Sequence, residues 1–157
     1  MIKLKQLLFE STAPDIFIPR RMENRVDRYI KQYIRNGSKG NLDLNQMELI
    51  ELPEILKDIS VSGYFNCAGN KLVDLKNSPK YVGGDFYCNY NKLTSLIGAP
   101  SSVGGNFDCR FNKLTSLAGA PKKVGMFFKC NHNPVMFTEE QVRAVCNVKG
   151  AVIVWLN

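Results

Sequence analysis

Four cysteines recur at a single interval and could, by their type, bind a metal or act as nucleophiles. They are Cys67, Cys88, Cys109 and Cys130, each 21 residues after the previous one. Metal-binding cysteines usually come as closely spaced pairs, and this sequence has none. Cysteines one repeat apart would instead sit on neighbouring strands and point the same way into a core. We therefore expect buried thiols, without a metal or a cofactor.

The other residues that could support catalysis are also isolated. His132 is the only histidine, and no acid or nucleophile stands at the repeat-equivalent positions to form a catalytic group with it. The glycine pairs Gly83-Gly84 and Gly104-Gly105 lack the lysine and the strand-to-helix setting of a phosphate-binding loop. These residues predict a protein that is not an enzyme.

The spacing of the cysteines comes from an internal repeat, which is the strongest signal in the sequence. The stretch CNYNKLTSLIGAP starting at Cys88 returns almost unchanged as CRFNKLTSLAGAP starting at Cys109. Four units have the same length, and an earlier one keeps their apolar spacing through Leu42 and Leu44 but is two residues longer. The units span 39–61, 62–82, 83–103, 104–124 and 125–145.

Each unit repeats the same apolar columns. A phenylalanine two residues before the cysteine predicts a short strand that points both side chains to one face. An aliphatic residue follows the cysteine by five positions, and a leucine comes three positions later. The three columns are Phe65, Phe86, Phe107 and Phe128; Leu72, Leu93, Leu114 and Val135; and Leu75, Leu96 and Leu117. We expect all of them in the core.

Over 39–145 this pattern resembles the leucine-rich repeat, in particular the short repeats of effectors from bacterial pathogens and of related phage and bacterial proteins. The resemblance implies an α/β solenoid: a short right-handed superhelix of about five turns, with a parallel β-sheet on one face and an N-terminal α-helical cap. It also implies a non-enzymatic module that binds another protein, for example an effector that modulates a host or defence protein. The prolines and glycines of each return arm predict extended or turn-like chain there.

An asparagine follows each cysteine by three residues. These asparagines are Asn70, Asn91, Asn112 and Asn133, and Met47 interrupts the column in the first unit. The resemblance implies stacked amides that bind backbone groups where the strand ends, since a buried unpaired polar group costs about 1–3 kcal/mol. A catalytic or glycosylated asparagine is the alternative.

Both ends of a solenoid need a cap. Residues 19–38 predict a helical cap whose apolar stripe is closed by Gly37. The stripe consists of Met22, Val26, Tyr29, Ile30, Tyr33 and Ile34. Thr138 and Gln141 form a capping-box pattern for a short helix to about Cys146, and 151–156 predict a strand within a C-terminal cap of 146–157.

Residues 1–18 form a separate N-terminal segment. The start MIKLKQLLFE resembles the capsid-targeting peptides of internal head proteins in large tailed phages, with Leu8-Phe9-Glu10 as the cleavage tripeptide. The alternative is an ordinary N-terminal helix. No run of about 18 apolar residues and no secretory signal occur. We expect no membrane contact and a cytoplasmic location, in a bacterial host or packaged in the phage head.

The outward positions of the strands differ from unit to unit, while the scaffold is copied. They are rich in tyrosine, phenylalanine, arginine and asparagine, a mixture typical of protein interfaces. We predict partner contacts at Tyr64, Asn66, Asp85, Tyr87, Asn89, Tyr90, Asp108, Arg110, Phe111, Lys129 and His132. The alternative is an ordinary solvated face.

The positive charge gathers at the N-terminal end. Residues 1–40 hold nine Lys/Arg against four Asp/Glu, whereas residues 41–82 hold four against six. A second hypothesis is therefore that the basic helix binds nucleic acid through phosphate contacts. The residues concerned are Arg20, Arg21, Arg25, Arg28, Lys31 and Arg35. A solvated helix face is the alternative.

Overall fold

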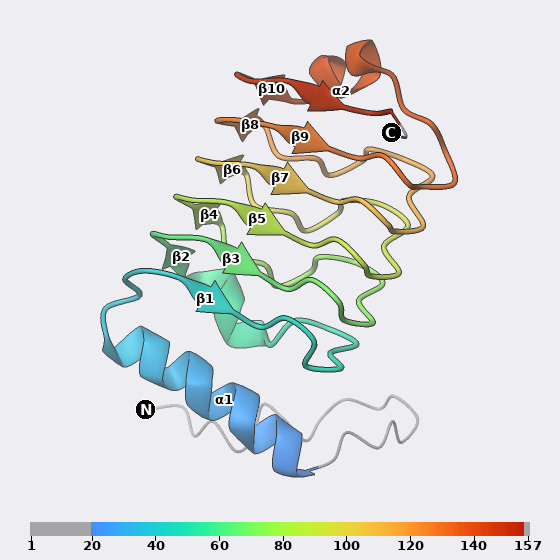
Figure 1. Ribbon diagram of the computed structural model, residues 1–157. Coiled ribbons are helices and arrows are strands. Elements are labelled where there is room, and N and C mark those ends of the chain that lie inside the picture. Colours follow the sequence, from blue (N-terminus) through green and yellow to red (C-terminus); the bar gives the residue numbers. More distant parts are fainter. Residues whose placement is uncertain (1–19, 156–157) are drawn as a thin grey trace.

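The computed structural model describes the backbone of residues 20–155 and the side chains of residues 25–155 (Figure 1). Over this range the chain forms a repetitive coil with two parallel sheets, each gaining one strand per turn. The first sheet consists of β1 (Leu42–Asp43), β3 (Phe65–Asn66), β5 (Phe86–Tyr87), β7 (Phe107–Asp108), β9 (Phe128–Lys129) and β11 (Val152–Ile153). The second consists of β2 (Ser60–Val61), β4 (Tyr81–Val82), β6 (Ser102–Val103), β8 (Lys123–Val124) and β10 (Asn147–Val148).

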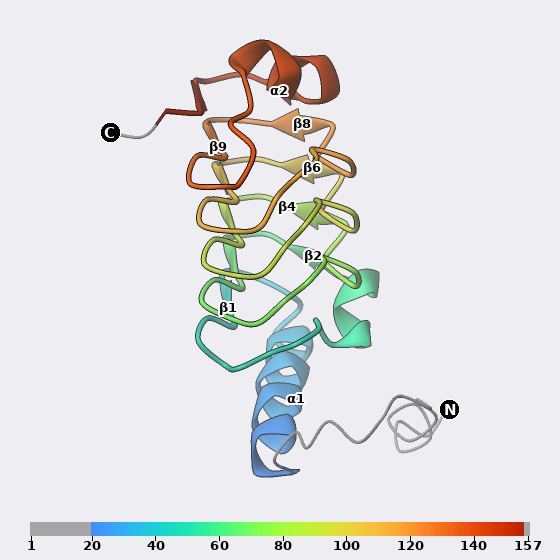
Figure 2. The ribbon, with the colours of Figure 1, turned by 90° about the vertical axis from the view of Figure 1, so that its right-hand side faces the viewer.

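The coil is right-handed. In Figure 1 the nearer strands run from left to right while the chain climbs from bottom to top and returns behind them. Figure 2, turned by 90°, shows that the connecting loops of successive turns follow nearly the same path. The equal length of the repeats explains this regularity, because each turn begins in register with the one before it.

The predicted inward columns form the core. Phe65, Phe86, Phe107 and Phe128 pair in register across the first sheet and are fully buried, with neighbouring ring centroids 5.4, 5.4 and 5.0 Å apart. The four repeat cysteines and the leucines of the next two columns are buried beside them. Val135 is the exception: its prediction as a core residue is wrong, since it is 38% exposed where the chain diverts into the C-terminal cap instead of returning.

The asparagine column has the predicted structural role. Asn91 Nδ2 donates to the carbonyl oxygens of Cys67 at 2.9 Å and Cys88 at 3.2 Å, and its Oδ1 accepts from the Leu72 N–H at 3.0 Å. Asn70, Asn112 and Asn133 make equivalent bonds. Each amide therefore joins two turns, and it bonds to backbone groups beyond the strand ends that have no partner in the sheet.

The return arms are extended, as predicted, but their assembly into a second parallel sheet was not predicted. A glycine column permits it, because a Cβ on Gly83, Gly104 or Gly125 would lie only 2.3, 2.0 or 1.9 Å from a carbonyl oxygen of the previous turn. The return arm of the first unit differs. This unit, 39–61, is two residues longer than the others and contains the 3-10 helix η1 (Glu54–Asp58).

Helices cover the two ends of the coil (Figure 1). Helix α1 (Arg20–Arg35) buries Val26, Ile30 and Tyr33, whereas Tyr29 lies at the edge of that stripe and is 40% exposed, contrary to prediction. Helix α2 (Glu139–Val145) begins at the predicted capping box, in which Thr138 Oγ1 accepts from the Gln141 N–H at 3.2 Å. Residues 146–155 then add β10 and β11, one strand to each sheet, rather than a single strand.

Candidate protein-binding face

The outward side of the first sheet brings the predicted partner-binding residues together. Asn66, Tyr87, Asp108 and Lys129 are paired in register on adjacent strands and form one row. The remaining predicted residues flank this row, before or just after the same strands. Neighbouring strands are about 4.8 Å apart, so residues from four repeats make one continuous surface.

Three rings are stacked where the strands of this face end. The ring centroids of Tyr90 and Phe111 are 4.4 Å apart with planes 6° from parallel, and those of Phe111 and His132 are 4.1 Å apart at 22°. Tyr90 is 55% exposed and His132 is also exposed. We call Tyr90, Phe111 and His132 the aromatic stack.

All three residues of the stack have left-handed backbone conformations, with φ of 54°, 54° and 57°. The equivalent residues of earlier turns, Gln46 and Gly69, have the same conformation, with φ of 51° and 65°. The left-handed region costs a residue with a side chain roughly 1–2 kcal/mol, and such strain gathers at functional sites. The fold needs this conformation in every turn, but it does not require aromatic side chains there.

A polar cluster lies at the other end of the strands. The Tyr87 hydroxyl donates to Asp85 Oδ2 at 2.6 Å, and Asp85 Oδ1 accepts from the Asn106 N–H at 2.6 Å. Burial acts to raise the pKa of Asp85, but these hydrogen bonds outweigh it and the pKa is lowered. The bond to Asp85, with burial, raises the pKa of Tyr87 to about 12. Tyr64 packs edge-on against Tyr87 with ring centroids 6.2 Å apart.

Asp108, a predicted contact residue, is only 2% exposed. Its carboxylate accepts from Arg110 Nε at 2.9 Å and from Arg110 Nη2 at 2.7 Å, so the guanidinium covers it. The bond to Asp108 is also the main reason that the pKa of Arg110 is raised. Arg110 therefore supplies the surface at this position, and Asp108 fixes its side chain.

The thiols lie in the core. Burial raises the pKa of Cys67, Cys88 and Cys109 well above that of an ordinary thiol. The Cys88 thiol lies 3.3 Å from the carbonyl oxygen of Asp108, a weak hydrogen bond to the next turn. Within residues 25–155, no group of three or more His, Cys, Asp or Glu side chains is arranged to hold a metal ion.

The basic residues of the second hypothesis lie on α1, at the base of the coil (Figure 1). Arg25, Arg28 and Arg35 are exposed, and Lys31 is half-buried. The side chains of Arg20 and Arg21, the N-terminal segment 1–18 with Leu8-Phe9-Glu10, and the predicted cap residue Met22 fall outside the described side chains. No helix in the described part of the chain is long and apolar enough to span a membrane.

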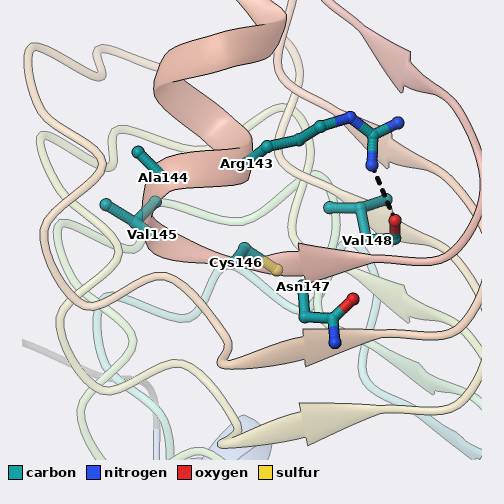
Figure 3. A pocket seen from close by; sticks show the side chains of 6 residues that line it. All are labelled: Arg143, Ala144, Val145, Cys146, Asn147 and Val148. Atoms are coloured by element: carbon teal, nitrogen blue, oxygen red, sulfur yellow. Dashed lines mark hydrogen bonds between the residues drawn. The ribbon is translucent and has the colours of Figure 1, made fainter.

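A hollow of about 380 Å³ lies at the C-terminal cap, and Arg143, which lines it, holds the cap together (Figure 3). Arg143 reaches across it and donates to the carbonyl oxygens of Val148 at 2.7 Å and Gly150 at 3.0 Å. Its Nε also donates to Glu139 at 2.7 Å, so the guanidinium is occupied in tying α2 to the turn before β11. Cys146, which also lines the hollow, is buried, and burial raises the pKa of its thiol to about 11.

The stacking of Tyr90, Phe111 and His132 was not predicted, although each was assigned to the face. The signal was the recurrence of flat side chains at one repeat position, two residues after Cys88, Cys109 and Cys130. No protein-family model and no curated protein matches this chain, so the geometry of the face must indicate the function.

Proposed function

We propose that this protein is a non-enzymatic module of the leucine-rich-repeat type that binds another protein through the outward side of its first sheet. The aromatic stack carries the proposal. Tyr90 and His132 are exposed and Phe111 between them is half-buried, and all three occupy left-handed positions where glycine would relieve strain. An ordinary solvated face gives no reason to place three rings there.

The composition of the face supports the same function. Tyrosine, phenylalanine and arginine are enriched in interface cores. The aromatic rings bury a large area with little loss of side-chain entropy. In the unbound protein, stacking already fixes Phe111, and two hydrogen bonds to Asp108 fix Arg110. Such preorganisation lowers the entropic cost of binding.

The resemblance to short bacterial and phage repeats supports a host-directed role. We propose an effector that modulates a host or defence protein in the bacterial cytoplasm. The resemblance of residues 1–10 to a capsid-targeting peptide supports packaging in a phage head as the route of delivery. Mass spectrometry of the mature protein tests that route, because cleavage after Glu10 would leave Ser11 as the first residue.

Affinity capture from a bacterial lysate, followed by calorimetry with the purified partner, tests the binding face. Replacing Tyr90 and Phe111 by alanine should weaken the complex by about 2 kcal/mol or more. The matched control replaces Lys122 and Lys123, two exposed residues of a return arm, and should change the affinity much less. If the lysines matter and the rings do not, the protein binds by charge at another face.

Nucleic-acid binding through α1 is a second candidate, favoured by the exposed Arg25, Arg28 and Arg35 on one helix. Fluorescence anisotropy with single- and double-stranded DNA tests it. Binding through several phosphates should weaken steeply between about 50 and 200 mM salt, and replacing Arg25 and Arg28 by glutamine should reduce that slope. A salt-insensitive affinity, or none, would exclude this candidate.

A further inference from the structure

The aromatic stack stops at a position without a side chain. One turn before Tyr90, the same left-handed position is Gly69. One turn earlier still it is Gln46, whose Cγ would lie 3.0 Å from a Cβ on Gly69. Gln46 and Tyr90 are two strand spacings apart, about 9.6 Å, which leaves room for one flat group at the spacing of the stack.

A hollow of about 590 Å³ lies at this position. Tyr90, at the end of the stack, lines it together with Gln46 and Gly69. Its other lining residues are Asn45, Asn66, Ala68 and Asn89. The hollow therefore combines one aromatic ring with several side-chain amides, and no charged side chain lines it.

The polar side chains around the hollow do not select a donor. Asn89 Oδ1 has no partner among the described residues, but it is buried even while the hollow is open, so an occupant of the hollow does not reach it. The ring of Tyr90, which is 55% exposed, is the group that an occupant contacts.

We infer that the hollow beside Gly69 binds an aromatic side chain of the protein partner. The incoming ring stacks on Tyr90 as the next member of the aromatic stack. This inference rests on the proposed function, since it names the group by which a protein partner is recognised.

The local charge favours a protein side chain over a nucleotide base. A nucleotide would also need cations for its phosphate, but residues 41–82 hold six Asp/Glu against four Lys/Arg. Lys71, one of these cations, is paired with Glu48. Because the contact is between two rings, the hollow should prefer aromatic side chains to aliphatic ones.

Nuclear magnetic resonance titration of the full chain with N-acetyl-tryptophanamide tests the inference. The probe should shift the amide signals of Gln46, Gly69 and Tyr90 with a dissociation constant on the order of 1–10 mM. N-acetyl-phenylalaninamide should shift the same signals, and N-acetyl-leucinamide should not. Stronger binding of uridine monophosphate or N-acetyl-argininamide than of the tryptophan probe would overturn the inference.

Gly69→Tyr fills the hollow with the chain's own ring. The left-handed backbone accepts it in the neighbouring turns, and Gln46→Ala in the same chain removes the one close contact. The double variant should bind the probe about tenfold more weakly. A side chain on this left-handed backbone costs stability, so Gly69→Asn, which carries the same strain but stays small, is the matched control and should keep the probe shifts. Tyr90→Gly, which removes the ring and suits the left-handed backbone, should abolish the probe shifts.

The two proposals fail differently. If a captured partner binds through Tyr90 and Phe111 but the tryptophan probe shifts nothing near Gly69, the inference is wrong and the binding face stands. If the probe binds at Gly69 as stated but replacing Tyr90 and Phe111 leaves the captured partner bound, the proposed binding face is wrong.

Discussion

Asn112 joins two turns of the coil through Cys88: its Nδ2 donates to the Cys88 carbonyl oxygen at 3.0 Å, across 24 residues of sequence. The same amide accepts from the Leu93 N–H at 3.1 Å and donates to the Cys109 carbonyl oxygen at 3.1 Å. One buried side chain therefore pairs backbone groups of two consecutive repeats. Without this amide, the buried backbone groups at this position would have neither a protein group nor water as a hydrogen-bond partner.

Replacing Asn112 by alanine should destabilise the protein by about 1–3 kcal/mol, because it leaves these buried groups unpaired. Urea denaturation followed by circular dichroism measures the loss. Asn147→Ala is the control, since Asn147 is exposed on β10, and its free energy of unfolding should stay within about 0.5 kcal/mol of the parent. Equal midpoints for the two variants would contradict the structural role of the column.

The five thiols should resist alkylation in the native protein. Burial raises the pKa of Cys130 to about 12 and that of Cys146 to about 11, so the reactive thiolate is scarce at neutral pH. Mass spectrometry after iodoacetamide treatment should find the five residues unlabelled until denaturant is added. We expect Cys146, in the terminal turn, to react first, and rapid labelling of Cys88 in the native state would contradict the core.

The sequence predicted the core well because burial recurs with the repeat. Phe86, Cys88 and Leu93 each stand in a column, and a column that is apolar in every turn has one physical explanation. The second sheet was harder to predict: Gly104 suggests a turn, whereas its role is to let two backbones approach. Only the packed coil shows that a Cβ there would meet the Gly83 carbonyl oxygen.

The face was predicted in location but not in detail. Side-chain contacts such as the Arg110 guanidinium on Asp108 depend on rotamers, which the spacing of residues does not fix. The aromatic stack depends on the left-handed backbone of Tyr90 and Phe111, which the sequence signals only through Gly69 at the same repeat position. Val135 was placed in an apolar repeat column that ends where the coil meets its C-terminal cap, and Tyr29 was placed in the apolar stripe of the N-terminal helix, at whose edge it is exposed.

Gly104→Ala should destabilise the protein by about 1–3 kcal/mol or more, as overpacking does in a tight interior. The added methyl would lie 2.0 Å from the Gly83 carbonyl oxygen, and backbone atoms there cannot give way without separating two turns. Thermal unfolding measures the change. Lys122→Ala, an exposed change in the same repeat, should leave the melting temperature nearly unaltered; a neutral Gly104→Ala would mean that the second sheet packs less closely.

Asp85 should make the stability of the protein depend on pH in the acidic range. Its pKa is lowered in the folded state, so its contribution is present above the unfolded value of about 3.9 and is lost as the pH falls further. Asp85→Asn should flatten the loss of stability between about pH 4 and pH 2. Denaturation midpoints across that range measure the difference. Parallel curves for parent and variant would show that the bonds from Tyr87 and Asn106 add nothing.

Tyr90→Gly and Tyr90→Ala separate the needs of the fold from those of binding. Both remove the ring, but glycine suits the left-handed backbone of φ 54° whereas alanine does not. The glycine variant should therefore be more stable than the alanine variant by about 1–2 kcal/mol, as seen in paired denaturation curves. Both should lose the partner to the same extent. That combination would mean that Tyr90 is kept at the expense of backbone strain for the surface it presents. If glycine and alanine are instead equally stable, the left-handed conformation carries no strain, and the main support for the binding face is lost.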